Sequence, residues 1–190
     1  MYDNWQQLED SIIDCRKCKL CINNKNNNIK LGYGNKNADI MFIGEILKED
    51  EDLSDFPFLG KPGQLMDKAF DGIGINKENV YFANIVKCMP TVNTILQENE
   101  IMACLDYLRN QVLLVKPKII VLLGNIAVKN ILGKDLEIIF TRGKWIERKN
   151  IFYMSTWEPS LLIKDANKKI EFWKDLKLVK QKAEMEELSI

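Results

Sequence analysis

The chain has 190 residues, of which 46% are apolar, and this is enough for one domain with a substantial core. Its 27 basic and 27 acidic side chains cancel, so the net charge identifies neither a nucleic-acid partner nor an acidic one. No apolar run approaches the roughly 20 residues of a membrane span, and the polar start does not resemble a signal peptide. We therefore expect a cytoplasmic monomer with a single domain over residues 1–190.

The sequence contains five cysteines and no histidine. In a reducing compartment, an odd number of cysteines favours ligands, nucleophiles or core residues over a disulfide framework. The missing histidine excludes Ser-His and Cys-His nucleophile pairs, histidine metal ligands and histidine general bases. Any acid–base chemistry must therefore come from carboxylates, lysine, tyrosine or water.

The predicted elements alternate between helices and short buried strands. A first helix, capped by Asp3 or Asn4, precedes the first cysteines. The last helix is expected to turn Ile170, Trp173, Leu176 and Val179 inward. Continuous apolar runs predict strands over residues 40–43, 80–83, 119–123 and 151–154, and helical spacing predicts helices over residues 64–70, 98–115, 125–132 and 167–187. This alternation predicts a three-layer α/β/α domain with a four-stranded, mainly parallel sheet.

Polar residues stand where three of the predicted strands end. Gly44 and Glu45 follow the first strand, Asn84 ends the second, and Glu158 and Ser160 follow the fourth. Open α/β sheets bind ligands in the crevice outside the carboxyl ends of their strands. An amide such as that of Asn84 both donates and accepts hydrogen bonds, so we expect a polar ligand there.

The cysteines form a second candidate site. Cys15 and Cys18 are separated by two residues, Cys88 follows the second strand, and Cys104 lies on the next helix. Four such thiolates would bind zinc or an iron-sulfur cluster and thereby connect the N-terminal segment to the sheet. Cys18 and Cys21 have the same spacing, so spacing alone leaves the choice of pair open. Cys104 could also be a small core residue.

These motifs together resemble the iron-sulfur uracil-DNA glycosylases of family 4, and the resemblance extends from Cys15 to about Val179. It includes the strand-end Gly44-Glu45, the Pro-Phe-x-Gly-x-x-Gly segment over residues 57–63 and the Asn-x-x-Lys-Cys segment over residues 84–88. The basic segment over residues 116–118 and Arg142-Gly143 also match. Their occurrence in the family's order makes the resemblance specific.

The resemblance implies the uracil-DNA glycosylase fold, and a DNA substrate containing uracil or another damaged base. A glycosylase of this kind flips the base out of the stack and binds it in a pocket. The implied substrate-binding residues are Gly44, Phe58, Gly60, Gly63, Asn84 and Ser160. Among these, Phe58 would stack on the base, Asn84 would read its polar edge, and the two later glycines would let backbone approach the DNA.

The resemblance also implies a catalytic carboxylate and a cofactor. Glu45 would orient the water that attacks C1′ of the sugar. The implied cofactor is a [4Fe-4S] cluster on Cys15, Cys18, Cys88 and Cys104, with zinc as the alternative.

Two segments depart from the family pattern. The family continues Gly-Glu with Ala-Pro-Gly, whereas here Ile46 begins a different loop that carries acidic residues over positions 49–55. The family's His-Pro-Ser is here Glu158-Pro159-Ser160, so the histidine that donates to the leaving uracil is replaced by Glu158. The sequence therefore leaves two functions open: a DNA glycosylase that uses Glu45 and Glu158, or a protein of the same fold that binds DNA, a nucleotide or a protein without cleaving.

Overall fold

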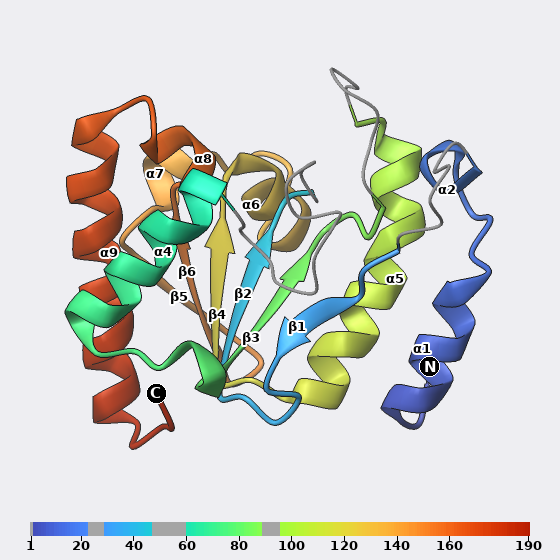
Figure 1. The fold of residues 1–190 in the computed structure, drawn as a ribbon, viewed down its shortest axis with the longest axis horizontal. Helices are drawn as coiled ribbons and strands as arrows, with labels where there is room; N and C mark the ends of the chain where they lie inside the picture. The colour runs from blue at the N-terminus through green and yellow to red at the C-terminus, as the bar shows by residue number, and fades with distance from the viewer. Residues whose placement is uncertain (1, 23–28, 47–59, 89–95) are drawn as a thin grey trace.

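A computed structural model describes residues 2–22, 29–46, 60–88 and 96–190, and it contains a six-stranded sheet in the order β1-β3-β2-β4-β6-β5. The four predicted strands form the parallel centre of this sheet (Figure 1). They are β2 (Ile40–Gly44), β3 (Val80–Asn84), β4 (Ile119–Leu123) and β6 (Ile151–Thr156). Because these strands are parallel, their carboxyl ends meet at one edge of the sheet.

The predicted count of four strands was wrong, because both edges of the sheet carry an additional short strand. β1 (Gly32–Gly34) pairs antiparallel with β3, and β5 (Trp145–Arg148) pairs antiparallel with β6. Neither contains the continuous apolar run of a buried strand, since β1 has two glycines and β5 includes Glu147 and Arg148. Edge strands are only partly covered, so they do not need such a run.

Helices cover both faces of the sheet (Figure 1). The predicted helix over residues 64–70 begins earlier, at Gly60, because Pro62 lies in the first helical turn, where a missing N–H is tolerated. Asn4 caps the first helix, as expected. The helices are α1 (Trp5–Ile13), α2 (Lys19–Ile22), α4 (Gly60–Ile73), the 3-10 helix η1 (Lys77–Asn79), α5 (Glu98–Val115), α6 (Asn125–Ile131), α7 (Ile138–Thr141), α8 (Pro159–Leu162) and α9 (Ala166–Met185).

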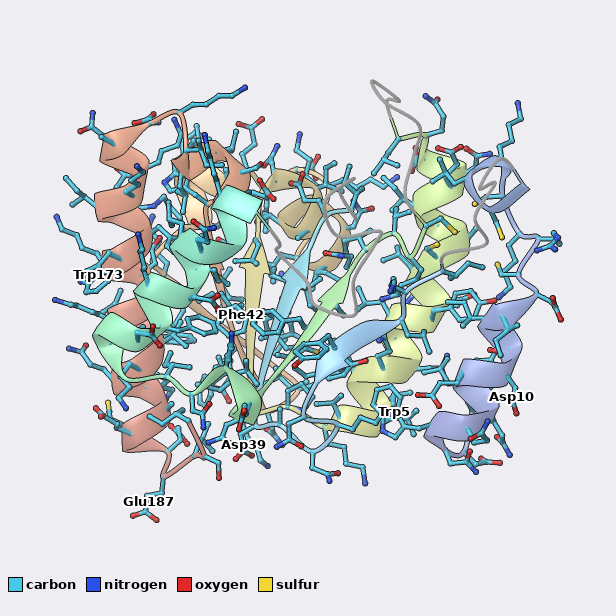
Figure 2. The ribbon with its side chains drawn as sticks, viewed as in Figure 1. Trp5, Asp10, Asp39, Phe42, Trp173 and Glu187 are labelled. Atoms are coloured by element: carbon cyan, nitrogen blue, oxygen red, sulfur yellow. The ribbon has the colours of Figure 1, made fainter. Side chains whose placement is uncertain are left out.

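Successive strand residues divide between two cores. Met41 and Tyr81 belong to the core beneath α1 and α5, whereas Phe42 and Phe82 belong to the core beneath α4 and α9. The Phe42 ring lies 5.2 Å from the ring of Phe70 on α4, and Figure 2 shows it in the interior. Such aromatic pairs add roughly 0.5–1.5 kcal/mol beyond their buried area. The alternation explains why every residue of the central strands β2, β3 and β4 is apolar or small except Asn84.

The buried face of α9 differs from the prediction. Ile170 is 57% exposed, whereas Asp175 is 2% exposed and lies between Phe172 and Leu176 on the buried face. The Arg142 guanidinium donates to Asp175 at 3.0 Å and the Thr156 hydroxyl donates to it at 2.7 Å. Burial raises the pKa of the Asp175 carboxyl, although both of these contacts act in the opposite direction. A paired carboxylate therefore sets the rotation of this helix. None of the described helices is long and apolar enough to cross a membrane.

Candidate active site

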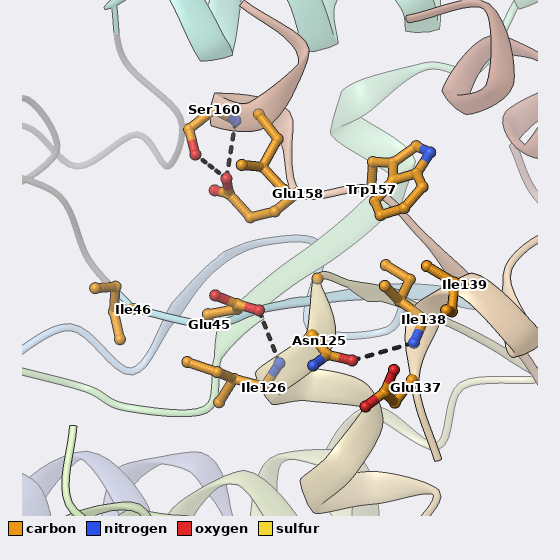
Figure 3. Close-up of a pocket in the computed structure, with 12 residues that line it drawn as sticks. Glu45, Ile46, Asn125, Ile126, Glu137, Ile138, Ile139, Trp157, Glu158 and Ser160 are labelled. Carbon is orange, nitrogen blue, oxygen red and sulfur yellow. Dashed lines mark hydrogen bonds between the residues drawn. The ribbon is translucent and has the colours of Figure 1, made fainter. Parts of the chain in front are cut away.

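A cavity of about 440 Å³ opens at the carboxyl ends of β2, β4 and β6 (Figure 3). Glu45, Glu158 and Ser160, all predicted site residues, contribute to its wall. The two carboxylates extend toward one side of the cavity, and Trp157 lies on the other side with Ile138 and Ile139. The cavity thus has one side with Glu45 and Glu158 and a mainly apolar half around Trp157, which Glu137 also lines.

Glu45 is held by backbone groups on both sides. Its Oε1 accepts a hydrogen bond from the Ile126 N–H at 2.8 Å, and its own carbonyl accepts from the Val86 N–H at 3.1 Å. Gly124 lies between the two glutamates with φ +93°, and a Cβ there would overlap the Glu45 carboxylate and come within 3.1 Å of the Glu158 Cβ. Only glycine accepts both that backbone conformation and that closeness. Gly124 therefore makes room for the Glu45 carboxylate.

Glu158 is the N-cap of α8 and is 7% exposed. Its Oε2 accepts hydrogen bonds from the Ser160 N–H, at 2.9 Å, and from the Ser160 hydroxyl (Figure 3). A carboxylate can only accept hydrogen bonds, whereas histidine can donate one. Glu158, which the sequence resemblance places at the position of the family's histidine, therefore acts as a helix cap in this structure.

The apolar half of the cavity is fixed by polar contacts behind it. The Trp157 indole N–H donates to Glu171 Oε2 on α9 at 2.6 Å. The Asn125 amide oxygen accepts from the Ile138 N–H at 3.1 Å, which ties the start of α6 to α7. These contacts place a flat aromatic ring opposite an aliphatic surface, an arrangement suited to a planar apolar group.

Exposed apolar side chains lie on α7 and α8, the two short helices that border the cavity. On α7, Ile139 is 58% exposed and Phe140 is 66% exposed, and on α8 Leu161 is 44% exposed. Ile139 and Leu161 also line the cavity itself. An apolar rim around a polar pocket is typical of a surface that a ligand covers.

Asn84 lies one strand away from this cavity, at the end of β3. It pairs with Gly44 of β2, and the Ile85 N–H donates to the Gly44 carbonyl at 2.9 Å, so the Gly44-Glu45 turn and Asn84 lie side by side. Asn84 is 8% exposed, and its side-chain amide forms no hydrogen bond with another described residue. Nearly buried amides normally have partners, so this one is suited to a polar ligand.

The structure also locates the predicted glycines. Gly60 begins α4 with φ +71°, and Gly63 is buried within the same helix, which packs against α8. Both glycines therefore lie on a helix next to the Glu158 segment. Phe58 and the acidic positions 49–55 fall outside the described residues.

The cysteines gather at the N-terminal side of the fold, where Figure 2 shows sulfur atoms between α2 and α5. Four of them, Cys15, Cys21, Cys88 and Cys104, are buried, and Cys18 is partly exposed. Burial raises the pKa of the Cys88 thiol, and the nearby thiols of all four other cysteines raise it further. Within the described ranges, no three cysteine or carboxylate side chains converge closely enough to count as a metal-binding group.

The comparisons with known proteins agree with this arrangement. Residues 31–177 match the family model of the uracil DNA glycosylase superfamily. The chain belongs to this superfamily. A type-4 uracil-DNA glycosylase of Sulfurisphaera tokodaii is 34% identical over 190 residues, which cover 95% of this chain and 86% of the relative. One of Archaeoglobus fulgidus is 34% identical over 185 residues, 92% of each chain.

A third relative is a much longer protein. A DNA polymerase of Bacillus phage SP01 is 29% identical over 149 residues, which cover 78% of this chain but only 16% of the polymerase. The predicted resemblance to family 4 and the predicted α/β class are therefore confirmed, apart from the number of strands.

Sequence reasoning missed several residues that shape the superfamily site in this chain. Gly124 directly follows the predicted strand over residues 119–123 and was not assigned to the site. Its position at the carboxyl end of a parallel strand, like that of Gly44, is the sequence signal that could have identified it. Trp157 precedes Glu158 directly but gave no separate signal. Asn125, where the predicted helix over residues 125–132 begins, lies in the first turn of α6, and Gly124 occupies the cap position.

Proposed function

We propose that the protein is a uracil-DNA glycosylase of base excision repair, which acts as a cytoplasmic monomer and hydrolyses the N-glycosidic bond of uracil or another damaged base in DNA. The observation that supports this most is Glu45, which is held over Gly124 by the Ile126 N–H inside a cavity at the strand ends. The names of the relatives supply the reaction class.

In the proposed reaction, Glu45 acts on water. Its carboxylate accepts a hydrogen bond from a water molecule and orients the oxygen toward C1′ of the sugar, as a positioned general base does. The bond between C1′ and the base nitrogen breaks, the base leaves with the bonding electrons, and the water oxygen bonds to C1′. The Glu45 carboxylate takes one proton from the water and passes it to the departed base, and an abasic site remains.

Base recognition is assigned to Asn84 and Phe58. The Asn84 amide, which is unpaired among the described residues, would donate to and accept from the polar edge of uracil. Phe58 is proposed as the stacking platform, and Gly44, Gly60, Gly63 and Ser160 as backbone and hydroxyl contacts to the nucleotide. The apolar rim with Phe140 would lie against the neighbouring bases, since bases stack readily on aromatic rings.

Glu158 is proposed to make this enzyme slow at neutral pH. Losing one hydrogen-bond donor to a developing anion typically costs ~3 kcal/mol of barrier, a hundredfold or more in rate. An ionised carboxylate about 4 Å from the leaving base would add repulsion on the order of 4 kcal/mol at an effective dielectric of 20. The Ser160 contacts draw the Glu158 carboxylate toward α8, which limits that repulsion.

We also propose a [4Fe-4S] cluster on Cys15, Cys18, Cys88 and Cys104. The donor set fits this group, because the thiols are gathered, mostly buried and mutually interacting, and thiolates are the ligands that such clusters use. When bound, the cluster would fasten the N-terminal segment to α5 and β3. Protein purified without oxygen should contain iron and sulfide, whereas stoichiometric zinc would overturn this assignment.

A variant identifies the ligand set. Cys21→Ser should retain the metal, because Cys21 lies outside the proposed set of four ligands. Its thiol already donates to the Cys15 carbonyl. Loss of the metal in Cys21→Ser would instead make Cys21 a ligand.

The proposed activity is tested on uracil-containing single- and double-stranded DNA, with alkaline cleavage of the abasic sites on a gel. Glu45→Gln should remove nearly all cleavage, because the amide cannot serve as the base. Glu137→Gln is the matched control, since Glu137 lines the same cavity but caps the start of α7 near Lys129. Equal cleavage by both variants and the wild type would show that Glu45 is not the catalytic group.

The alternative is a binding protein of the same fold. It is favoured by one observation, the use of Glu158 as a helix cap where the family has its donor. Tight binding of uracil-containing DNA with no cleavage at any pH would support that function instead.

A further inference from the structure

Lys87 is a buried cation between the two proposed sites. Its side chain is fully buried, and its ammonium donates to the Asn84 carbonyl at 2.7 Å, to the Leu31 carbonyl at 3.1 Å and to the Gln111 amide oxygen. All three acceptors are neutral, and no described carboxylate pairs with it. A buried charge without a counter-charge is costly, so an anion nearby would offset much of that cost.

The acceptors of Lys87 are themselves held in place. The Gln111 amide nitrogen donates to the Leu31 carbonyl and to the Tyr81 hydroxyl, each at 2.8 Å. Gln111 lies on α5, Tyr81 on β3 and Leu31 just before β1, so three elements fix the position of the ammonium. The network therefore has one geometry, and it ends on the backbone of Asn84.

The other side of Lys87 faces the thiols. Cys88, one of the proposed ligands, follows Lys87 directly in the chain, and Cys104 is close enough to interact with its ammonium. Burial lowers the pKa of the Lys87 ammonium to about 7, whereas the charge of the nearby Cys104 thiol acts in the opposite direction. Thiolates bound to a cluster carry a net negative charge, and the potential of a cluster depends on nearby charge and on hydrogen bonds to sulfur.

We propose that Lys87 is a positioning residue for both sites: its ammonium is the internal counter-charge of the thiolate cluster, and its hydrogen bond to the Asn84 carbonyl holds the base-reading amide in place. This inference rests on the proposed cluster and on the proposed role of Asn84. The Lys87 side chain would then link the cluster to the base pocket. A substitution at Lys87 should therefore change both the reduction potential of the cluster and the preference for uracil.

Three variants separate the two effects. Lys87→Met removes the charge and the hydrogen bonds while keeping most of the length. Gln111→Glu keeps the hydrogen bond from Lys87 to the Asn84 carbonyl. It also places a carboxylate against the Lys87 ammonium, which neutralises the positive charge. Lys87→Arg keeps the charge but cannot reproduce the geometry at Asn84. Tyr81→Phe is the matched control, because it removes a hydroxyl from the network and leaves every Lys87 contact.

Two readouts are used on anaerobically purified protein. The first is the reduction potential of the cluster, from a spectroelectrochemical titration. The second is the ratio of the dissociation constants for thymine- and uracil-containing single strands, measured with Glu45→Gln added so that bound DNA stays intact. Neither is an activity.

Lys87→Met should shift the potential to more negative values and reduce uracil preference by roughly five- to tenfold, the usual worth of one positioning hydrogen bond. Gln111→Glu should shift the potential alone, Lys87→Arg should reduce the preference alone, and Tyr81→Phe should change neither.

An unchanged reduction potential in Gln111→Glu would refute the role of Lys87 as a counter-charge of the cluster. An unchanged uracil preference in Lys87→Arg would refute its role in positioning Asn84. Both variants decide the question even if Lys87→Met does not fold. A wild-type protein without iron, or without uracil preference, would instead mean that the proposed function has failed.

Discussion

Replacing Glu158 with histidine should raise the rate of uracil release at neutral pH. In the structure, Glu158 offers only acceptor oxygens to the cavity, and both of its contacts to Ser160 use Oε2. Histidine would restore a donor, worth ~3 kcal/mol or about a hundredfold in rate, and would remove like-charge repulsion of up to about 4 kcal/mol. The substitution also removes the cap of α8, which costs about 1 kcal/mol of folding free energy.

The assay is a single-turnover measurement at neutral pH, with stability followed by chemical denaturation so that the lost cap is not mistaken for lost catalysis. Glu158→Gln should fall between wild type and Glu158→His, because it removes the charge and supplies an amide donor. A robust neutral rate that survives Glu158→Ala would refute the reasoning. No gain in Glu158→His would move the defect to the altered loop that begins at Ile46.

Three further predictions follow from other parts of the structure. Gly124→Ala should lower the cleavage rate and cost roughly 1–3 kcal/mol of stability, because it crowds Glu45 at a positive φ; a wild-type rate would show that this carboxylate can move without effect. Phe140→Ala should weaken binding to single-stranded DNA about tenfold in a fluorescence titration, whereas Ile170→Ala, at an exposed position on α9, should not. Because burial raises the pKa of Asp175 in the folded state, its contribution to stability is fully present below the unfolded pKa of about 3.9 and is lost as pH rises through the folded value. The stability of the wild type relative to Asp175→Asn should therefore decline over that pH range in denaturant titrations, and a constant difference would contradict the shift.

The centre of the fold could be predicted from sequence because its physical signal is local. A strand buried on both faces must be apolar along its whole length, and β2 and β4 are. Glu45 and Asn84 were identified because each stands where such a run stops. Edge strands β1 and β5 carry no comparable signal, since only one side of each is paired.

The contacts that complete the site could not be predicted because they are made between distant segments. Glu45 is held by Ile126, 81 positions away, and the buried Asp175 depends on Arg142, 33 positions away. An aspartate on an amphipathic helix is ordinarily placed in solvent, and the positions of Arg142 and Thr156 reverse that expectation. The partners of Lys87 likewise come from Leu31 and Gln111, on separate elements.

The most direct test of the proposed activity is the release of free uracil from a uracil-containing single strand by excess anaerobically purified protein, detected by mass spectrometry. The wild type should release uracil slowly, Glu45→Gln should release almost none, and Glu137→Gln should match the wild type. Binding of the strand with no uracil released by the wild type or by Glu158→His would contradict the proposed activity.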